Sequence, residues 1–323
     1  MTRATQLTRM LCEKEVFDEE FLAADKNAWY SINKRKMSVQ FAEQFYPLQY
    51  DSGTHEFLIN SLNLSNNVCL QMFYSATISF MSIFTTKTNI NGILDRGRMH
   101  IFSDDQLQSF LNLEPEWISS DKTVLDLGAG DGMVTKHLET FYKNVYVTEM
   151  SPIMQWRLGQ KGFTTVDPMK WFEHRIIANK EVNLISVLNL LDRHYNPHLL
   201  LEQLHEAALS SGALVMLGIV LPVKQFVEFH PSASTNKADT DIFLKGTTFE
   251  EQAESIVKNL LVPFGFELIR FSKVPYICEG DSTRPYYKLT DALMLLKAVP
   301  KQSSQTISTT TVSSFNGDIH IEL

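Results

Sequence analysis

Three glycines at alternate positions give this sequence its clearest chemical meaning. They lie in Asp126-Leu127-Gly128-Ala129-Gly130-Asp131-Gly132, which follows the apolar pair Val124-Leu125. The pattern predicts a strand, a loop and a helix, with the loop backbone too close to a ligand for side chains. A dinucleotide fingerprint would place glycine where Met133 stands, and a phosphate-binding loop would need Gly-Lys-Ser/Thr. The loop therefore favours S-adenosylmethionine as ligand, with Asp126, Gly128, Gly130 and Gly132 as binding residues.

An acidic residue ends the second predicted strand. Glu149 follows the β-branched and aromatic run 144–148, and an acid at this place in a βαβ unit accepts hydrogen bonds from ribose hydroxyls. Ser151-Pro152 comes next and suits the N-cap and first position of a helix. Glu149 is therefore also suited to capping that helix, and both roles stay open. The loop and the acid together indicate a cofactor site more strongly than either one does.

Further candidates follow from the rule that open α/β sheets bind ligands beyond the carboxyl ends of their strands. Asp167, after the third strand, is placed to accept the adenine amino group, although an aspartate before proline is also an ordinary turn residue. The run Asn189-Leu190-Leu191-Asp192-Arg193, after the fourth strand, lies where a transferable methyl group would face a substrate. Asn189 offers a donor and an acceptor, whereas Asp192 offers only acceptors. His194 is interpreted as a solvated loop residue.

A second candidate segment lies late in the chain. Pro275-Tyr276-Ile277-Cys278-Glu279-Gly280-Asp281 precedes Tyr286-Tyr287 and is expected to lie outside a strand. Two groups of tyrosines with two acids are unusual for a plain connector, and packing at a strand edge is the competing interpretation. Cys278 has no base nearby in the sequence and is interpreted as a packed thiol.

The elements that must position these residues alternate between strand-like and helical runs from Thr123 onward, which predicts a parallel sheet covered on both faces. The predicted fold is α/β: a Rossmann-like class I methyltransferase with a seven-stranded, mostly parallel sheet. Its last two strands are expected at 266–271 and 292–297, and the irregular insertion 222–246 is of the kind that lies over a binding site. We expect a polar segment (1–55), a helical extension packed on the catalytic domain (56–118), the methyltransferase domain (119–298) and a disordered Ser/Thr-rich tail (299–323).

Composition narrows the set of partners. The 323 residues carry a net charge of −8, which argues against a nucleic-acid partner. Cys12, Cys69 and Cys278 are too far apart for a zinc spacing, so no metal is expected. Residues 57–86 contain no charged side chain, yet their many asparagines, serines and threonines favour a buried helix over a membrane span. The protein is expected to be a monomer.

Together these segments resemble the DREV, or methyltransferase-like protein 9, family of protein-histidine N-pros-methyltransferases. The resemblance runs from about residue 55 to 298 and rests on 90–97 (Ile-Asn-Gly-Ile-Leu-Asp-Arg-Gly), 124–132, Thr148-Glu149, 189–193 and 275–281. It implies that Gly128, Gly130 and Glu149 bind S-adenosylmethionine with Asn189 beside it. It also implies that Asp192, Tyr276 and Tyr287 line the site of the target histidine. We therefore expect Asn189, Asp192 and Tyr287 in catalysis, Arg193 in the substrate site, and Asp167 and Tyr276 at the cofactor.

The resemblance also implies a partner, because the family modifies histidines in His-x-His segments of proteins where x is small. Our hypothesis is that Asp192 accepts the tele N–H of the target imidazole, so that the pros nitrogen attacks the methyl group. The chain begins without an apolar leader, which suggests the cytoplasm, whereas the family implies the endoplasmic reticulum or mitochondrion. The alternatives are a methyltransferase of a small molecule and a non-catalytic binding module. A nicotinamide oxidoreductase is disfavoured by Met133.

Overall fold

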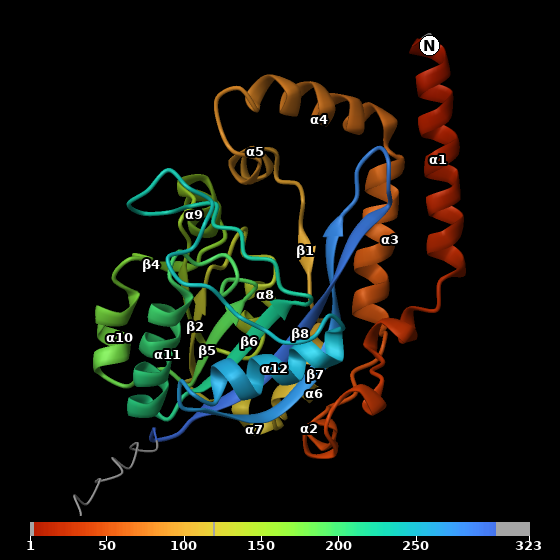
Figure 1. Ribbon diagram of the computed structural model, residues 1–323. Helices are drawn as coiled ribbons and strands as arrows, with labels where there is room; N and C mark the ends of the chain where they lie inside the picture. Colours follow the sequence, from red (N-terminus) through yellow and green to blue (C-terminus); the bar gives the residue numbers. More distant parts are fainter. Residues whose placement is uncertain (1–2, 119, 302–323) are drawn as a thin grey trace, which may run out of the picture.

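A mixed sheet with strand order β1-β7-β8-β6-β5-β2-β3-β4 organises the molecule (Figure 1). The computed structural model describes residues 3–118 and 120–301. The strands are β1 (Met99–His100), β2 (Thr123–Leu127), β3 (Asn144–Thr148), β4 (Thr164–Val166), β5 (Leu184–Leu188), β6 (Leu214–Val220), β7 (Phe266–Glu279) and β8 (Tyr286–Ala298). β2 to β6 pair in parallel, and β8 and β7 follow antiparallel beside β6. The α/β, mostly parallel fold is therefore confirmed.

Helices cover both faces of the sheet because alternate strand residues point to opposite sides. In β2, Leu125 joins a core cluster with α11 (Pro197–Ser211) and α12 (Phe249–Ile256), whereas Val124 joins a cluster with α6 (Asp104–Leu111) and α8 (Thr135–Glu139). The remaining elements of this half are α7 (Pro115–Ile118), α9 (Pro152–Gln160), η3 (Trp171–Glu173), α10 (Arg175–Ala178) and the π-helical turn η4 (Val257–Leu261). The central strands β2, β5 and β6 thus enter a core on both sides, which fixes where their carboxyl ends lie.

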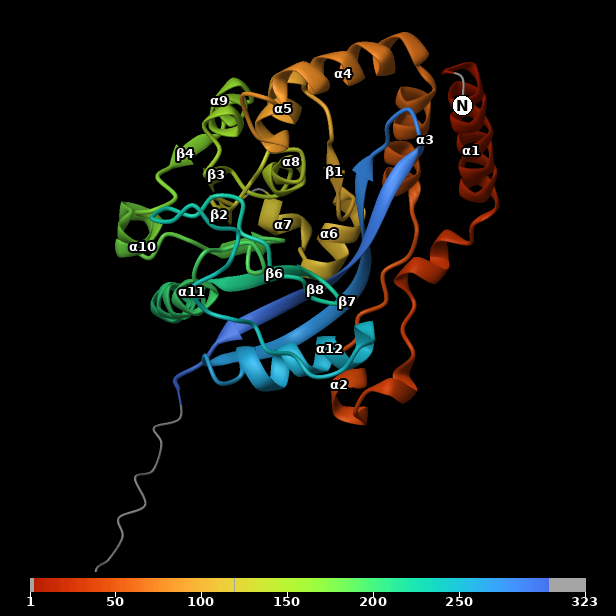
Figure 2. The ribbon, with the colours of Figure 1, turned by 45° about the horizontal axis from the view of Figure 1, so that its top comes forward.

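The N-terminal third lies along the hairpin formed by β7 and β8 (Figures 1 and 2). Phe21 of α1 (Arg3–Ala23) and Leu58 of α3 (Ser52–Asn66) pack with Ile277 of β7 in one cluster. The connecting elements are η1 (Lys26–Tyr30), η2 (Lys34–Lys36) and α2 (Val39–Glu43), and α4 (Val68–Met81) and α5 (Lys87–Leu94) follow α3. The domain boundaries expected from the sequence remain predictions, and residues 302–323 of the expected disordered tail lie outside the described part.

The strand predictions need two corrections. The sheet has eight strands instead of seven, because the two-residue β1 pairs with Ile277 and Cys278 at the outer edge of β7. Both hairpin strands are longer than expected, and segment 275–279 belongs to β7 instead of lying outside a strand. Pro275 lies where β1 no longer pairs with β7, and an unpaired strand edge accepts proline.

The prediction of one buried helix for residues 57–86 is also wrong. The segment forms two helices, α3 and α4, which meet at Asn67, where the Asn67 side chain caps α4 by accepting from the Leu70 backbone N–H at 3.1 Å. The side chain of Leu58 in α3 is buried, whereas most apolar side chains of α4 are exposed. No helix in residues 3–118 and 120–301 is both long and apolar enough to cross a bilayer.

Candidate active site

The glycine loop connects β2 to α8 and forms the floor of a pocket at the carboxyl ends of the parallel strands. Gly128, Gly130 and Gly132 all have positive φ, at 76°, 58° and 77°, which side chains disfavour. A β-carbon on Gly130 would meet no atom within 4 Å, so this glycine faces open space in the pocket. A β-carbon on Gly132 would lie 2.8 Å from Leu158, and Gly132 is not among the pocket-lining residues. Gly128 and Gly130 thus face the ligand space, whereas Gly132 allows the loop to pack.

Two acidic residues brace the loop. The buried Asp126 accepts hydrogen bonds from Thr135 Oγ1 at 2.6 Å and from the Ser186 hydroxyl, so its carboxylate mainly ties neighbouring elements together. Glu149 accepts from the Gly130 N–H at 3.0 Å and from the Ser151 N–H at 2.8 Å, and it lines the pocket. Burial raises the pKa of both carboxyls. Glu149 therefore holds Gly130 and the start of α9 in place, with the rest of its acceptor capacity facing the pocket.

Asp167 lies differently from the expectation. Its side chain is exposed at the end of β4 and accepts from the Met169 N–H at 2.9 Å, which is the turn role that the sequence left open. The following residues, Pro168 and Met169, line the pocket, but Asp167 does not. An apolar turn therefore borders the pocket here.

Asn189 is the first residue after β5 and lies in a strained backbone conformation. Its φ is 54°, which is uncommon for a residue with a side chain. The side-chain Nδ2 donates to Asp291 Oδ2 at 2.6 Å, while Oδ1 is buried and has no hydrogen-bond partner among the described residues. An ionised carboxylate only accepts hydrogen bonds, so Asp291 binds the NH₂ group of Asn189. The amide oxygen of Asn189, Oδ1, is left unpaired. Asn189 lines the pocket, so it can accept one hydrogen bond from a ligand.

Asp192, Arg193 and Tyr276 form a charged and aromatic group beside Asn189. Asp192 is buried, its Oδ1 has no partner within the described chain, and burial raises its pKa. The Arg193 guanidinium lies 5.9 Å from the centre of the Tyr276 ring, and both residues line the pocket, although Asp192 does not. The Tyr276 hydroxyl donates to the sulfur of Met99. The structure therefore brings Arg193 and Tyr276 to the pocket, whereas Asp192 is buried outside its lining.

Tyr287 does not reach the pocket lining. It is 41% exposed in β8, and its hydroxyl donates to Asp281 Oδ2 at 2.9 Å. The register pairs Tyr276 with Leu289 and Cys278 with Tyr287, so Tyr287 shares one face of the hairpin with Tyr276. Its position is thus on the surface that extends from the pocket along the hairpin.

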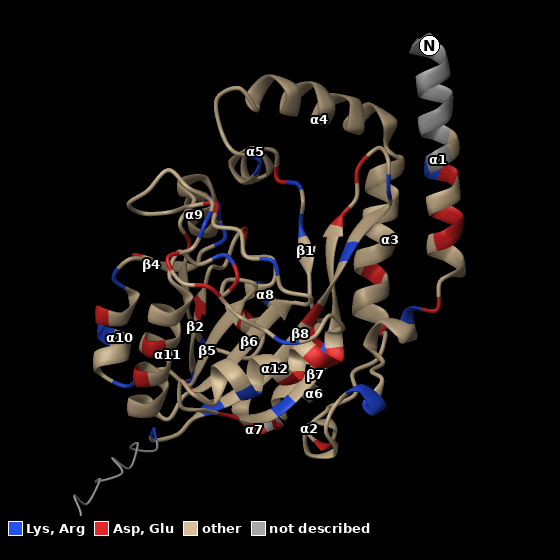
Figure 3. Ribbon diagram, viewed as in Figure 1, with Lys and Arg blue, Asp and Glu red and all other residues tan. Residues whose placement is uncertain are grey.

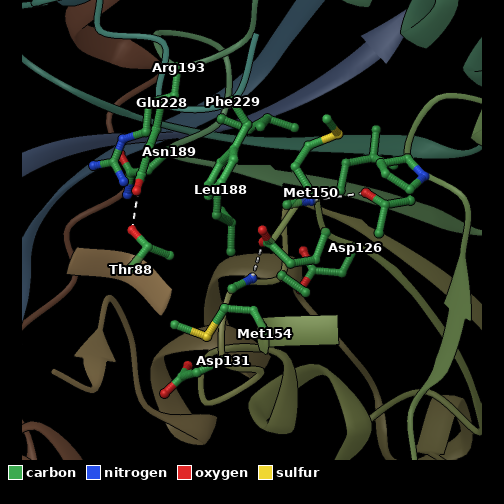
Figure 4. A pocket seen from close by; sticks show the side chains of 18 of the residues that line it. Thr88, Asp126, Asp131, Met150, Met154, Leu188, Asn189, Arg193, Glu228 and Phe229 are labelled. Carbon is green, nitrogen blue, oxygen red and sulfur yellow. Dashed lines mark hydrogen bonds between the residues drawn. The ribbon is translucent and has the colours of Figure 1, made fainter. Parts of the chain in front are cut away.

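The sequence analysis missed several residues that Figure 4 shows around the pocket. The insertion 222–246 reaches over the pocket, as expected, and Glu228 and Phe229 line it. Glu228 Oε2 accepts from Thr88 Oγ1 of α5 at 2.7 Å, which joins two segments on opposite sides of the opening. His194 also lines the pocket, contrary to its interpretation as a solvated loop residue, and burial lowers its pKa.

The lining residues fit S-adenosylmethionine, which carries two cationic groups, a carboxylate and a ribose. Asp131, Glu149 and Glu228 supply negative charge, Arg96 and Arg193 supply positive charge, and Gly130 leaves open space where a side chain would project. The unpaired Asn189 Oδ1 adds a buried acceptor that needs a donor from outside the chain. Gly128, Gly130, Glu149 and Asn189 line the pocket and could hold the cofactor.

Solved structures resemble this chain only at low identity and low TM-score. A S-adenosylmethionine-dependent methyltransferase from Anabaena variabilis is 12% identical, with 65% of this chain and 91% of that chain covered and a TM-score of 0.40. A TehB-like methyltransferase from Corynebacterium glutamicum is 12% identical over 72% of this chain and all of its own (100%), at a TM-score of 0.34. The N-terminal domain of EvdMO1 with SAH bound is 14% identical, with 60% of this chain and 80% of that chain covered and a TM-score of 0.33.

The match to a family is far more extensive. The sequence model of the DREV methyltransferases aligns with residues 29–298. This range includes the glycine loop, the strand-end acids Glu149 and Asp167, the segment 189–193 and the whole β7–β8 hairpin. That range contains every residue placed at the pocket above, whose lining fits S-adenosylmethionine as the methyl donor. The chain belongs to the DREV methyltransferase family.

Proposed function

We propose that this methyltransferase modifies the pros nitrogen of histidines in His-x-His segments of target proteins. One observation carries the proposal: Asn189, which lines the pocket, and Asp192 and Asp291, which are buried outside its lining, each have a buried side-chain oxygen without a partner among the described residues. Arg193 contributes to the electrostatic environment of both aspartates. A donor from outside the chain is therefore needed there, and the N–H of a neutral imidazole is such a donor.

The residues give this site a way to choose one ring nitrogen. A neutral imidazole has one N–H and one nitrogen with a lone pair, and the hydrogen bond at the N–H fixes which is which. We infer that Asp192 accepts the tele N–H and leaves the lone pair on the pros nitrogen. Because burial raises the pKa of Asp192, this carboxylate is also a better proton acceptor than an exposed one.

S-adenosylmethionine supplies a methyl group bound to positively charged sulfur, which needs little acid catalysis to leave. The contribution of the protein is then mainly alignment. In this proposal Tyr276 and Arg193, which both line the pocket, border the imidazole. When the pros nitrogen gains the methyl group, the ring becomes cationic. Loss of the tele proton toward Asp192 and then to solvent returns it to neutral.

The experiment uses labelled S-adenosylmethionine with a His-Ala-His peptide and a matched peptide in which asparagine replaces both histidines. We expect transfer only to the histidine peptide, at the pros nitrogen as determined by NMR. Gly128→Arg is the inactive control, because Gly128 has a φ of 76° and its β-carbon would lie 3.1 Å from Leu190. Cofactor binding without transfer to either peptide would contradict the proposal and favour a small-molecule substrate.

A further inference from the structure

Large apolar side chains cover the outer side of α4 and the turn that follows it. Each is at least 57% exposed, although a cluster of this kind is normally buried or functional. The six side chains, which we call the α4 face, are Val68, Met72, Phe73, Phe80, Ile83 and Phe84. At 100° per residue the four that belong to α4, Val68, Met72, Phe73 and Phe80, fall within one half of the helix surface, with Cys69 and Ala76 between them. Ile83 and Phe84 lie in the turn that follows.

The side of α4 that faces the protein is more polar than the α4 face. Gln71 and Tyr74 are its buried residues, and Gln71 Nε2 donates to the Leu64 carbonyl at 3.0 Å. Arg96 lies 5.1 Å from the centre of the Tyr74 ring. A surface helix of a soluble protein normally has the opposite arrangement, with apolar residues inward. The helix is therefore built for a low-polarity neighbour on its outer side.

The polar groups of α4 indicate which neighbour this is. No charged residue occurs from 57 to 86, and in Figure 3 α4 contains neither blue nor red. Three hydroxyls bond to carbonyls of the helix itself: Thr77 to Phe73 at 2.9 Å, Ser79 to Ser75 at 2.8 Å and Ser82 to Ser79 at 3.2 Å. A protein groove has a polar rim that would offer such hydroxyls partners, whereas hydrocarbon offers none. Hydroxyls satisfied within the helix suit lipid.

We propose that the α4 face docks the enzyme on the surface of a lipid bilayer, with the helix lying in the interface. At 14 residues, α4 is about 21 Å long, too short to span the bilayer. α5 follows directly, and its Thr88 and Asn91 line the pocket. Docking would therefore hold the pocket opening close to the membrane, where segments of membrane-bound proteins are within reach.

The test is flotation of the full chain with vesicles of pure phosphatidylcholine. Because the α4 face has no charge, we expect binding to these neutral vesicles that changes less than twofold between low and high salt. Phosphatidylserine should not strengthen it, since the chain has a net charge of −8. Phe73→Ser with Phe80→Ser is expected to weaken binding at least tenfold. The control pair Leu209→Ser with Val262→Ser, also exposed but elsewhere, should stay within twofold of wild type.

A second measurement does not alter the aromatic residues. Cys69 is exposed on the same face, and with Cys12→Ser an environment-sensitive fluorophore on Cys69 should shift to the blue when vesicles are added. The serine pair should keep full methylation of a soluble peptide, so this result is independent of the substrate proposal. Failure of the wild-type chain to float, or an unshifted fluorophore, would overturn docking. A concentration-dependent dimer abolished by the serine pair would instead assign the α4 face to a second copy.

Discussion

Replacing Asp291 by asparagine is expected to stabilise the protein at pH 8 but not at pH 5. Asp291 is fully buried in β8, where Asn189 Nδ2 bonds to Oδ2 while Oδ1 has no partner in the described chain. The pKa of Asp291 is raised from 3.8 to about 7, mainly by burial and further by the negative charge of Asp192, against the lowering effects of the Asn189 hydrogen bond and of Arg193. The ionised group is therefore costly to the fold.

The sign and size of the effect follow from proton binding. Below pH 3.8 both the folded and unfolded chains hold the proton, so ionisation costs nothing. Between pH 3.8 and about 7 only the folded chain keeps it, so the free energy of unfolding falls as pH rises, by about 4 kcal/mol in total. The introduced amide avoids that cost but buries an NH₂ group without an acceptor, at about 1–3 kcal/mol. The net gain is about 1–3 kcal/mol at pH 8 and close to zero, or a loss, at pH 5.

Urea unfolding at the two pH values measures this difference, with Asp167→Asn as the control because Asp167 is an exposed strand-end acid. The control should change the free energy of unfolding little, and equally, at both pH values. Turnover of Asp291→Asn should fall about tenfold, since a negative charge is lost near the ring that becomes cationic. If Asp291→Asn changed the free energy of unfolding by the same amount at pH 5 and pH 8, Asp291 would not ionise between these pH values and the reasoning would be refuted.

Three further predictions concern the pocket. Asp192→Ala should lower turnover on a His-x-His peptide by about 10²–10⁴ without loss of folding, and undiminished transfer to the same nitrogen would exclude its role. Gly132→Ala should cost at least about 2 kcal/mol of stability, whereas Gly130→Ala should cost only about 1–2 kcal/mol and mainly weaken cofactor binding measured by calorimetry. Thr88→Val removes the 2.7 Å bond to Glu228 and should raise the peptide KM about fivefold at constant cofactor affinity. An unchanged KM would show that this contact does not shape the substrate site.

Features set by neighbours in the sequence could be predicted well. The loop glycines have the positive φ that their spacing indicated, and Ser151 caps α9 by accepting from the Met154 N–H at 3.2 Å. Ser103 and Gln106, a Ser-x-x-Gln pattern readable in the sequence, form a capping box at α6. In each case the interacting groups lie within a few residues, so backbone geometry alone decides the outcome.

Contacts between distant segments could not be predicted in the same way. Asn189 and Asp291 are 102 positions apart, and Thr88 and Glu228 are 140 apart. The only local indication of Asp291 is a single acid within the apolar run 289–296. The position of Tyr287 depends on the hairpin register, which extends β7 and β8 beyond their expected ends. Strand pairing, and not residue type, decides which of these residues meet.

The segment 57–86 shows a different limit. An uncharged, apolar sequence specifies a neighbour of low polarity, and inside a globular chain the usual neighbour is the protein core. Asn67 ends that possibility, because it caps a new helix and turns α4 away from the core that holds Leu58 of α3. The same composition then favours a neighbour of low polarity on the outer side of α4. Because the hydroxyls of α4 bond within the helix, this neighbour does not have to supply hydrogen bonds. Composition thus determines the polarity of the surroundings, and only the direction of the helix determines whether protein or lipid provides them.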